Sequence, residues 1–195
     1  MMKEISYREL NVNPMTMFAE EWFALAAGNE NDGANAMTIA WGQLGSLWER
    51  DSHANRLPTV TVYVRPGRYT KGIMDREDLF TLSLIEDRKA LGYIGSHSGR
   101  DGDKLTAAGL TPVYEDGTVY CQDAKMVLIC RKLYQATLKE DGFVDKGLID
   151  FNYPMRDFHE MYIGEIIRVL VRDDMPRTSS GKIEYRTLEE TAKEN

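Results

Sequence analysis

The sequence lacks any long run of apolar residues. Its apolar stretches, such as residues 126–130 (MVLIC), are far shorter than the roughly 20 residues that a membrane-spanning helix needs. The charged N-terminus also has no apolar segment that ends in a cleavage site, as a secretory signal would. We therefore expect a soluble, cytoplasmic protein without a membrane partner.

Cysteine and histidine are also scarce. The chain has 2 cysteines and 3 histidines in 195 residues. Cys121 and Cys130 have no histidine at a ligand spacing, and the histidines form no pattern such as HExxH. These absences argue against a disulfide framework and against a metal site. They favour two reduced, mostly buried thiols.

The chain has no excess of positive charge. It carries 24 lysines and arginines against 31 aspartates and glutamates, so its formal net charge is -7. This charge disfavours a general nucleic-acid binder, because such proteins neutralise phosphates with lysine and arginine. Any anion that this protein binds must therefore meet a local cluster of cations.

The sequence also lacks internal repeats and low-complexity tracts, which excludes repeat architectures. Its length suits one compact domain. We predict that this domain spans residues 1–172 and that residues 173–195 form a polar C-terminal tail. Ser179, Ser180 and Gly181 indicate a flexible link within that tail.

Alternating and β-branched segments predict a mainly β fold with a few short helices. The expected strands are residues 59–65, 80–84, 119–138 and 160–172. The third segment is either one long bent strand or two strands joined by a bulge. In the last strand, Gly164 indicates a bulge, a barrel corner or the close approach of another group. The expected helices are residues 87–95 and 104–108. Residues 17–27 are left open between helix and strand, and residues 141–157 are expected to form a loop with a short helical turn.

A first cluster of cations lies at residues 65–71 (RPGRYTK), where a predicted strand ends in a turn. Arginine presents a planar fork of donors that matches phosphate oxygens, and backbone N–H groups after Gly67 are free to point at an anion. The cluster is therefore a candidate phosphate cradle. The alternative is a solvated turn whose cations balance nearby acids.

A second cluster lies at residues 96–104 (SHSGRDGDK). Gly99 and Gly102 permit tight turns close to a ligand, but Asp101 or Asp103 could simply cap the following helix. Calcium is set aside, because the loop lacks the glutamate that would be its last ligand.

A third candidate segment is residues 33–48 (GANAMTIAWGQLGSLW), in which small residues surround Asn35, Thr38 and two tryptophans. Small residues would let the backbone lie against a flat ring. The alternative is a strand and a glycine-rich turn that bury Trp41 and Trp48 in the core.

Taken in order, the segments NAMTIAWG, PTVTVYVRPGRYT, FTLSL, GSHSGRDGDK and HEMYIGEI resemble the flavin reductase family. No single motif is specific, but the ordered set is. The resemblance covers residues 33–172 and implies an FMN-binding split β-barrel with residues 21–28 as its first strand. It also implies non-covalent FMN in a homodimer whose two sites lie near the subunit interface.

The resemblance further implies which residues contact FMN. They are Asn35, Ala36, Met37, Thr38 and Trp41 at the ring, Arg65, Arg68, Tyr69, Thr70 and Lys71 at the phosphate and ribityl chain, and Ser98, Gly99, Arg100, Asp101 and Lys104 in the following loop.

The activity that the resemblance implies is hydride transfer from NAD(P)H to flavin. The chain lacks the GxGxxG pattern of a Rossmann fold, so NAD(P)H would bind transiently over the flavin. His159 matches a position that faces the flavin or nicotinamide, and it is the single catalytic candidate. The alternatives are a flavoredoxin-type FMN electron-transfer protein and a non-catalytic flavin-binding module. Residues 141–158 are a candidate gate.

Overall fold

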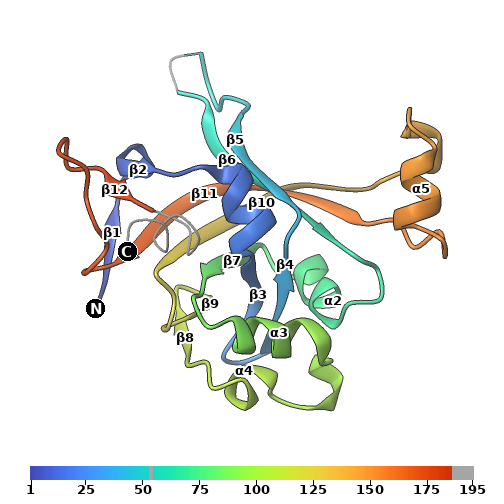
Figure 1. The fold of residues 1–195 in the computed structure, drawn as a ribbon, viewed down its shortest axis with the longest axis horizontal. Coiled ribbons are helices and arrows are strands. Elements are labelled where there is room, and N and C mark those ends of the chain that lie inside the picture. Colours follow the sequence, from blue (N-terminus) through green and yellow to red (C-terminus); the bar gives the residue numbers. More distant parts are fainter. Residues whose placement is uncertain (53–54, 186–195) are drawn as a thin grey trace.

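The computed structural model describes residues 1–52 and 55–185 and shows a mainly β protein, as predicted (Figure 1). The strands are β1 (Met2–Ile5), β2 (Leu10–Asn11), β3 (Phe23–Asn29), β4 (Gly33–Ile39), β5 (Gly42–Leu47), β6 (Leu57–Val64), β7 (Leu79–Leu84), β8 (Pro112–Glu115), β9 (Thr118–Cys121), β10 (Met126–Thr137), β11 (Glu160–Arg172) and β12 (Ile183–Glu184). The helices are α1 (Pro14–Thr16), α2 (Tyr69–Arg76), α3 (Arg88–Ser96), α4 (Lys104–Ala107) and α5 (Gly147–Asn152).

One antiparallel sheet organises the molecule. Its strands follow the order β4-β3-β7-β10-β11-β6-β5, and β1 also pairs with β11. In Figure 1, α3 and α4 lie together at one end of this sheet, while α5 stands apart from it. The pairing of Glu160 with Val64 places the start of β11 beside the end of β6, which brings two segments distant in sequence together.

The central strands are buried on both faces. Phe23, Leu25 and Ala27 of β3 contact the core inside the curved sheet. Ala24 and Ala26 face the opposite side, in a second core that includes residues of α3 and α4. Successive strand residues point to opposite faces, so a strand covered on both faces needs an unbroken apolar run. This explains the segment MVLIC at residues 126–130.

Strands are present in all four expected segments, but residues 119–138 form neither one bent strand nor two strands joined by a bulge: a turn at residues 122–125 separates β9, which pairs with β8, from β10. The pairing of β10 with β11 shifts register beyond Lys132, which lies opposite Gly164. A Cβ atom at Gly164 would lie 2.6 Å from the ring of Phe80. Gly164 therefore marks both a local irregularity and a close approach, as predicted.

Residues 17–27 combine both structures that the sequence left open. Met17–Glu21 form one wide helical turn, and β3 begins at Phe23. Trp22 joins them with a φ of 62°, a left-handed conformation that is uncommon for a residue with a side chain. The first strand implied by the resemblance is thus present, although it begins later.

Helices α3 and α4 confirm the two helices that were predicted. Asp103 caps α4 by accepting hydrogen bonds from Leu105 N at 3.1 Å and Thr106 N at 3.2 Å, so the capping interpretation of this aspartate is confirmed. Helix α2 was missed, because Pro66 and Gly67 were interpreted as a simple turn. No helix within residues 1–52 and 55–185 is long and apolar enough to cross a membrane.

The described part of the predicted tail packs against the barrel. Met175, Ile183 and Tyr185 are buried in the inner core, and β12 pairs with β2 in parallel. The Tyr185 hydroxyl also donates a hydrogen bond of 3.1 Å to the Glu21 carboxylate. The core therefore continues past residue 172 to Tyr185. Residues 186–195 of the predicted tail lie outside the described residues.

Candidate functional site

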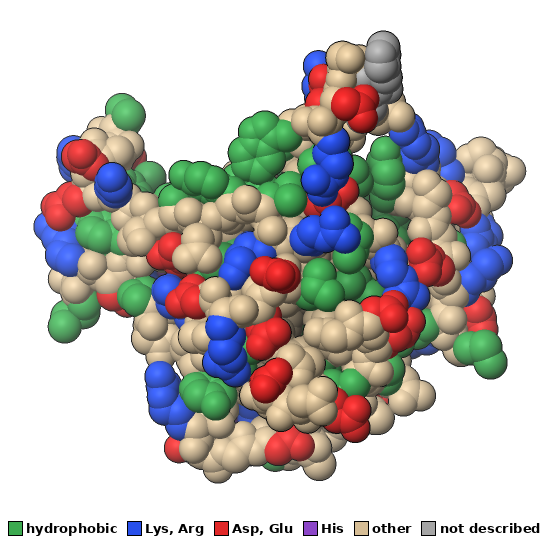
Figure 2. All heavy atoms as spheres, turned by 180° about the vertical axis from the view of Figure 1, so that it is seen from behind, with side chains coloured by type: hydrophobic (Ala, Val, Ile, Leu, Met, Phe, Trp, Pro, Cys, Tyr) green, Lys and Arg blue, Asp and Glu red, His purple; other side chains and the backbone are tan. Residues whose placement is uncertain are grey.

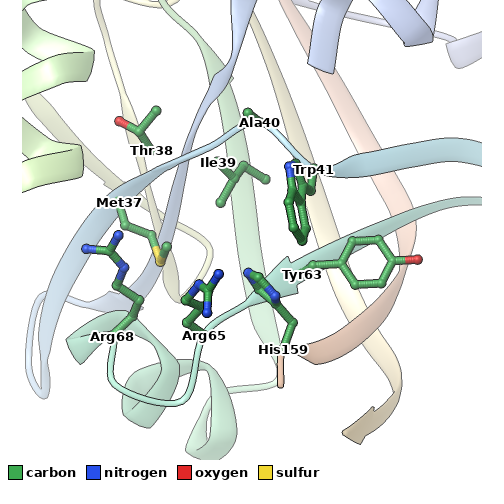
Figure 3. Close-up of a pocket in the computed structure, with 9 residues that line it drawn as sticks. All are labelled: Met37, Thr38, Ile39, Ala40, Trp41, Tyr63, Arg65, Arg68 and His159. Carbon is green, nitrogen blue, oxygen red and sulfur yellow. The ribbon is translucent and has the colours of Figure 1, made fainter. Parts of the chain in front are cut away.

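A hollow of about 190 Å³ opens where β4 ends, β6 ends and β11 begins (Figure 3). We call it the ring hollow. It is lined by Met37, Thr38, Ile39, Ala40, Trp41, Tyr63, Arg65, Arg68 and His159. Because β6 and β11 are paired, Arg65 and His159 converge on the same wall, as Figure 3 shows.

Aromatic rings form one side of the ring hollow. The rings of Trp41 and His159 lie 4.7 Å apart at 40°. Trp41 is 43% exposed and Trp48 is 45% exposed, so the interpretation that both tryptophans are buried in the core is wrong. The Trp41 ring instead offers an accessible flat surface beside the hollow.

His159 is only 8% exposed although it lines the ring hollow. Its Nδ1 lies 2.8 Å from the hydroxyl of Tyr153. Burial, and then the positive charge of Arg65, lowers the pKa of His159 to about 4. The imidazole is therefore neutral near pH 7 and can offer a hydrogen bond without carrying a charge.

A second hollow of about 190 Å³ adjoins the first, and the two share Met37 and Arg68 as lining residues. We call it the anion hollow. Its other lining residues are Gly67, Tyr69, Thr70, Ser96, His97, Ser98, Gly99, Arg100 and Lys104.

The anion hollow is electropositive. Arg68, Arg100 and Lys104 line it, and none of its described lining residues is acidic. Arg68 donates to the Gly95 carbonyl at 3.2 Å, and the Arg100 guanidinium lies over the Tyr69 ring at 5.4 Å. Neither guanidinium forms an ion pair with a carboxylate in the described part of the chain. Their charges are therefore left for a ligand.

Lys104 is nearly buried and holds the end of α3. Its Nζ donates to the carbonyls of Ile94 at 2.8 Å and His97 at 3.0 Å. Burial, followed by the charge of Arg68, lowers the pKa of Lys104 to about 8. An anion in the hollow would oppose that shift.

Gly99 allows the loop to approach the strands closely. A Cβ atom there would lie 2.4 Å from Asn35 Oδ1 and 2.5 Å from the Tyr69 ring. Asn35 is buried behind this loop and donates from Nδ2 to Thr70 Oγ1 at 2.7 Å. This bond connects β4 to the first turn of α2, so Asn35 supports the wall of the anion hollow from behind.

The structure separates some residues that the sequence grouped together. Asn35 and Ala36 are buried and line neither hollow, and the Thr38 hydroxyl donates to the Leu91 carbonyl. Lys71 pairs with Asp75 at 2.7 Å, and Asp101 lines a neighbouring hollow. The predicted residues that line one or both hollows are Met37, Thr38, Trp41, Arg65, Arg68, Tyr69, Thr70, Ser98, Gly99, Arg100, Lys104 and His159.

Arg65 also has a partner within the chain. Its guanidinium pairs with Asp157 at 2.6 Å and donates to the Asn152 carbonyl at 2.7 Å. The same guanidinium lies 5.2 Å from the ring centre of Tyr153. Residues 143–158 therefore hold Arg65 at the ring hollow, where its charge is largely neutralised.

Sequence reasoning missed Tyr63, Tyr153, Ser96 and His97. Tyr63 could have been found, because strand alternation places it on the same face as Arg65, two residues later. Ser96 and His97 belong to a cluster that was recognised. Tyr153 had no signal, because it lies in an irregular segment that the sequence cannot place.

The two hollows together offer aromatic walls and a cluster of cations. Residues 52–187 match the flavin reductase like domain, a known protein family. A search of curated protein sequences found no match.

Solved structures share the fold. Flavoredoxin of Desulfovibrio vulgaris (Miyazaki F) is 21% identical with a TM-score of 0.62, and the match covers 94% of this chain and 83% of that one. A putative flavin reductase with a split barrel domain from Shewanella frigidimarina is 16% identical with a TM-score of 0.60, covering 92% and 81%. An FMN-binding protein from Thermus thermophilus is 20% identical with a TM-score of 0.57, covering 88% and 84%. These likenesses identify the fold as a split barrel, and the family match over most of the sequence shows that the chain belongs to the flavin reductase like domain family.

Proposed function

We propose that this protein is an FMN-binding oxidoreductase that takes hydride from NAD(P)H. The observation that carries the proposal is the adjacency of the two hollows, which share Met37 and Arg68. FMN combines a large flat ring with a phosphate that is dianionic near pH 7. One hollow has aromatic walls, and the other has cations that lack an acidic partner within residues 1–52 and 55–185, so the donor set fits this group.

The residues of each hollow would hold a different part of FMN. Trp41 and His159 offer flat surfaces for the ring, and Arg68 and Arg100 offer donors for the phosphate. Lys104 adds a third positive charge. When bound, FMN supplies two-electron acceptor chemistry, which the side chains of the chain do not supply themselves.

The role proposed for the protein in hydride transfer is orientation. Trp41 is accessible at the mouth of the ring hollow, which leaves room for a second flat ring to approach. Holding two reactants face to face accelerates their reaction by removing the entropy of their encounter. His159 is neutral near pH 7, so it would contribute a hydrogen bond and would neither carry nor release a proton there.

The first test is the absorption spectrum of the purified protein, followed by titration with FMN. We expect flavin bands after purification or after FMN is added, and FMN-dependent oxidation of NADH or NADPH. A protein that binds no FMN and oxidises neither nucleotide would refute the proposal.

A second candidate is an FMN electron-transfer protein of the flavoredoxin type. The exposed Trp41 beside the ring hollow favours it, because such a protein must let a partner approach the flavin. Steady-state turnover with free flavin distinguishes the two candidates. A reductase turns over free FMN with NAD(P)H, whereas an electron-transfer protein keeps its FMN and needs a protein partner.

We also propose that the protein is a homodimer. Hydrophobic side chains gather on the face seen in Figure 2, in the recess between the projecting α5 segment and the β5–β6 hairpin. The most exposed large hydrophobic residues of these elements and their flanks are Val144, Phe151, Met155, Trp48 and Leu148. Such a surface is typical of a protein interface. Light scattering coupled to size-exclusion chromatography should give about twice the 22.2 kDa chain mass. A monomer at micromolar concentration would refute this proposal.

The cytoplasm is the compartment that we propose. Cys121 and Cys130 are both free and buried, which suits a reducing environment.

A further inference from the structure

The segment between β10 and β11 contacts Arg65 and His159, two residues that line the ring hollow. Its helix α5 stands off the barrel (Figure 1), but an aromatic cluster anchors the segment at its base. Tyr153 lies within 5.7 Å of Phe143 and 4.8 Å of Phe158, measured between ring centres. Tyr153 is 2% exposed, so its ring is shielded from water within this cluster.

Tyr153 contacts both groups that converge on the ring hollow. Its hydroxyl lies 2.8 Å from His159 Nδ1, and its ring lies edge-on to the imidazole at 5.5 Å. The face of the same ring lies under the Arg65 guanidinium. Tyr153 does not line the ring hollow itself, so it contacts Arg65 and His159 from outside the hollow.

The direction of the Tyr153–His159 hydrogen bond follows from what a buried phenol requires. A buried hydroxyl hydrogen needs an acceptor, and His159 Nδ1 is the one that the described residues offer to Tyr153. If the imidazole donated instead, the hydroxyl hydrogen would have no acceptor among those residues. The phenol is therefore the donor, and the neutral imidazole carries its own hydrogen on Nε2.

We propose that Tyr153 is a positioning residue that fixes His159 as a neutral imidazole with its Nε2–H free to donate to a ligand in the ring hollow. The charges that face His159 are those of Arg65, Arg68 and Asp157, of which only the last favours the imidazolium. A donor at this wall suits a ligand with an acceptor oxygen or nitrogen on its ring edge. This part of the inference rests on the proposed binding of a flavin.

The hydrogen bond can be tested without any flavin. The chain has 3 histidines, so long-range proton–nitrogen correlation spectra of protein labelled with nitrogen-15 histidine are simple, and the His159→Gln variant assigns the signal. We expect the Nε2–H tautomer at pH 7 in the wild type. In Tyr153→Phe we expect a mixture of tautomers and a higher pKa for His159. A wild-type Nδ1–H tautomer would overturn the proposal, as would an unchanged tautomer in Tyr153→Phe.

A second readout uses FMN and separates the two proposals. We expect Tyr153→Phe and His159→Gln each to weaken FMN binding by about five- to tenfold, the scale of one hydrogen bond, and the double variant to be no worse than either. Tyr114→Phe removes an exposed hydroxyl from β8 and is the matched control. Additive losses would overturn the positioning role. A wild type that shows the Nε2–H tautomer but binds no FMN would refute the proposed function alone.

Discussion

The arginines of the two hollows differ in whether a carboxylate of the described chain pairs with them. At the ring hollow, Arg65 forms an ion pair with Asp157 and lies over the Tyr153 ring, so its charge takes part in contacts within the protein. At the anion hollow, Arg68 and Arg100 have contacts with a carbonyl and a ring but no described carboxylate partner. The turn at residues 65–71 thus begins with Arg65, whose charge is neutralised, and continues with Arg68, whose charge is available to a ligand.

This difference shows that a cluster of cations in a sequence is not a site by itself. In the folded protein, Lys71 forms an ion pair with Asp75, and Arg65 forms one with Asp157. Among the cations of the two predicted clusters, those without an acidic partner in the described part of the chain are Arg68, Arg100 and Lys104, and all three line the anion hollow. Positive charges that lie close together without an acidic partner repel one another, and a bound anion reduces this repulsion.

The largest expected effect is on FMN affinity when the available charges are removed. The double variant Arg68→Ala and Arg100→Ala should weaken FMN binding by about 3 kcal/mol or more, roughly a hundredfold, because each charged hydrogen bond contributes about 1.5–3 kcal/mol. Fluorescence titration measures the change. Lys71→Ala removes a cation of the same turn that Asp75 already neutralises, and we expect a loss below about fivefold. Equal losses would contradict the distinction between the two kinds of cation.

The next effect concerns the close approach at Gly99. Gly99→Ala would place a Cβ atom 2.4 Å from Asn35 Oδ1, so the loop must move away from the strands. We expect a loss of about 1–3 kcal/mol in the free energy of unfolding, measured by urea denaturation, together with weaker FMN binding. Gly72→Ala is the matched control, because nothing lies within 4 Å of the added atom and alanine favours a helix. If both variants were equally stable, the loop would not be held by this contact.

A third effect is a pH dependence that belongs to the anion hollow. In the folded protein the pKa of Lys104 is lowered to about 8, and a bound phosphate favours the ammonium. Below pH 8 the ammonium is already present, so this lysine does not change the affinity. Above pH 8 binding requires uptake of a proton, and FMN affinity should fall by up to about tenfold per pH unit. Titrations from pH 7 to pH 9.5 measure the slope, and Lys104→Met should abolish it. An affinity that rises with pH would contradict the assignment.

The smallest effect is expected at the neutralised arginine. Asp157→Asn removes the carboxylate beside Arg65, but the Asn152 carbonyl and the Tyr153 ring still contact the guanidinium. The pair is partly exposed, so we expect a slightly lower Tm and a change in FMN affinity below about fivefold. Thermal denaturation and the FMN titration measure both. A loss as large as that of the Arg68 and Arg100 variant would mean that the two regions do not differ.

The sequence predicted much of the fold because its strands are patterned strongly. The runs at residues 80–84 and 160–172 have one reasonable interpretation, and both became strands. Residues 17–27 could not be decided, because Ala, Leu and Phe suit both structures and the break at Trp22 depends on its φ of 62°. Packing, which local patterns do not encode, also determined that Ile183 and Tyr185 join the core.

The site was predictable in part for a similar reason. Arg68, Gly99 and Arg100 lie in turns beside strand ends, where ligands commonly bind, and these residues line the anion hollow. The pairing of Arg65 with Asp157 spans 92 residues, and no local rule anticipates it. The role of Tyr153 was also not predictable from the sequence, because it depends on how an irregular segment folds back onto the barrel.

The most direct measurement compares the affinities of FMN and riboflavin, which carry the same ring and differ in the phosphate. Both are titrated into the wild type and into the Arg68→Ala and Arg100→Ala double variant. If the ring and the phosphate occupy separate hollows, the wild type should bind FMN about a hundredfold more tightly than riboflavin. The variant should lose most of that preference, with a much smaller change in its affinity for riboflavin, because Arg68 also lines the ring hollow. Equal affinities for FMN and riboflavin in the wild type would contradict the assignment of the anion hollow.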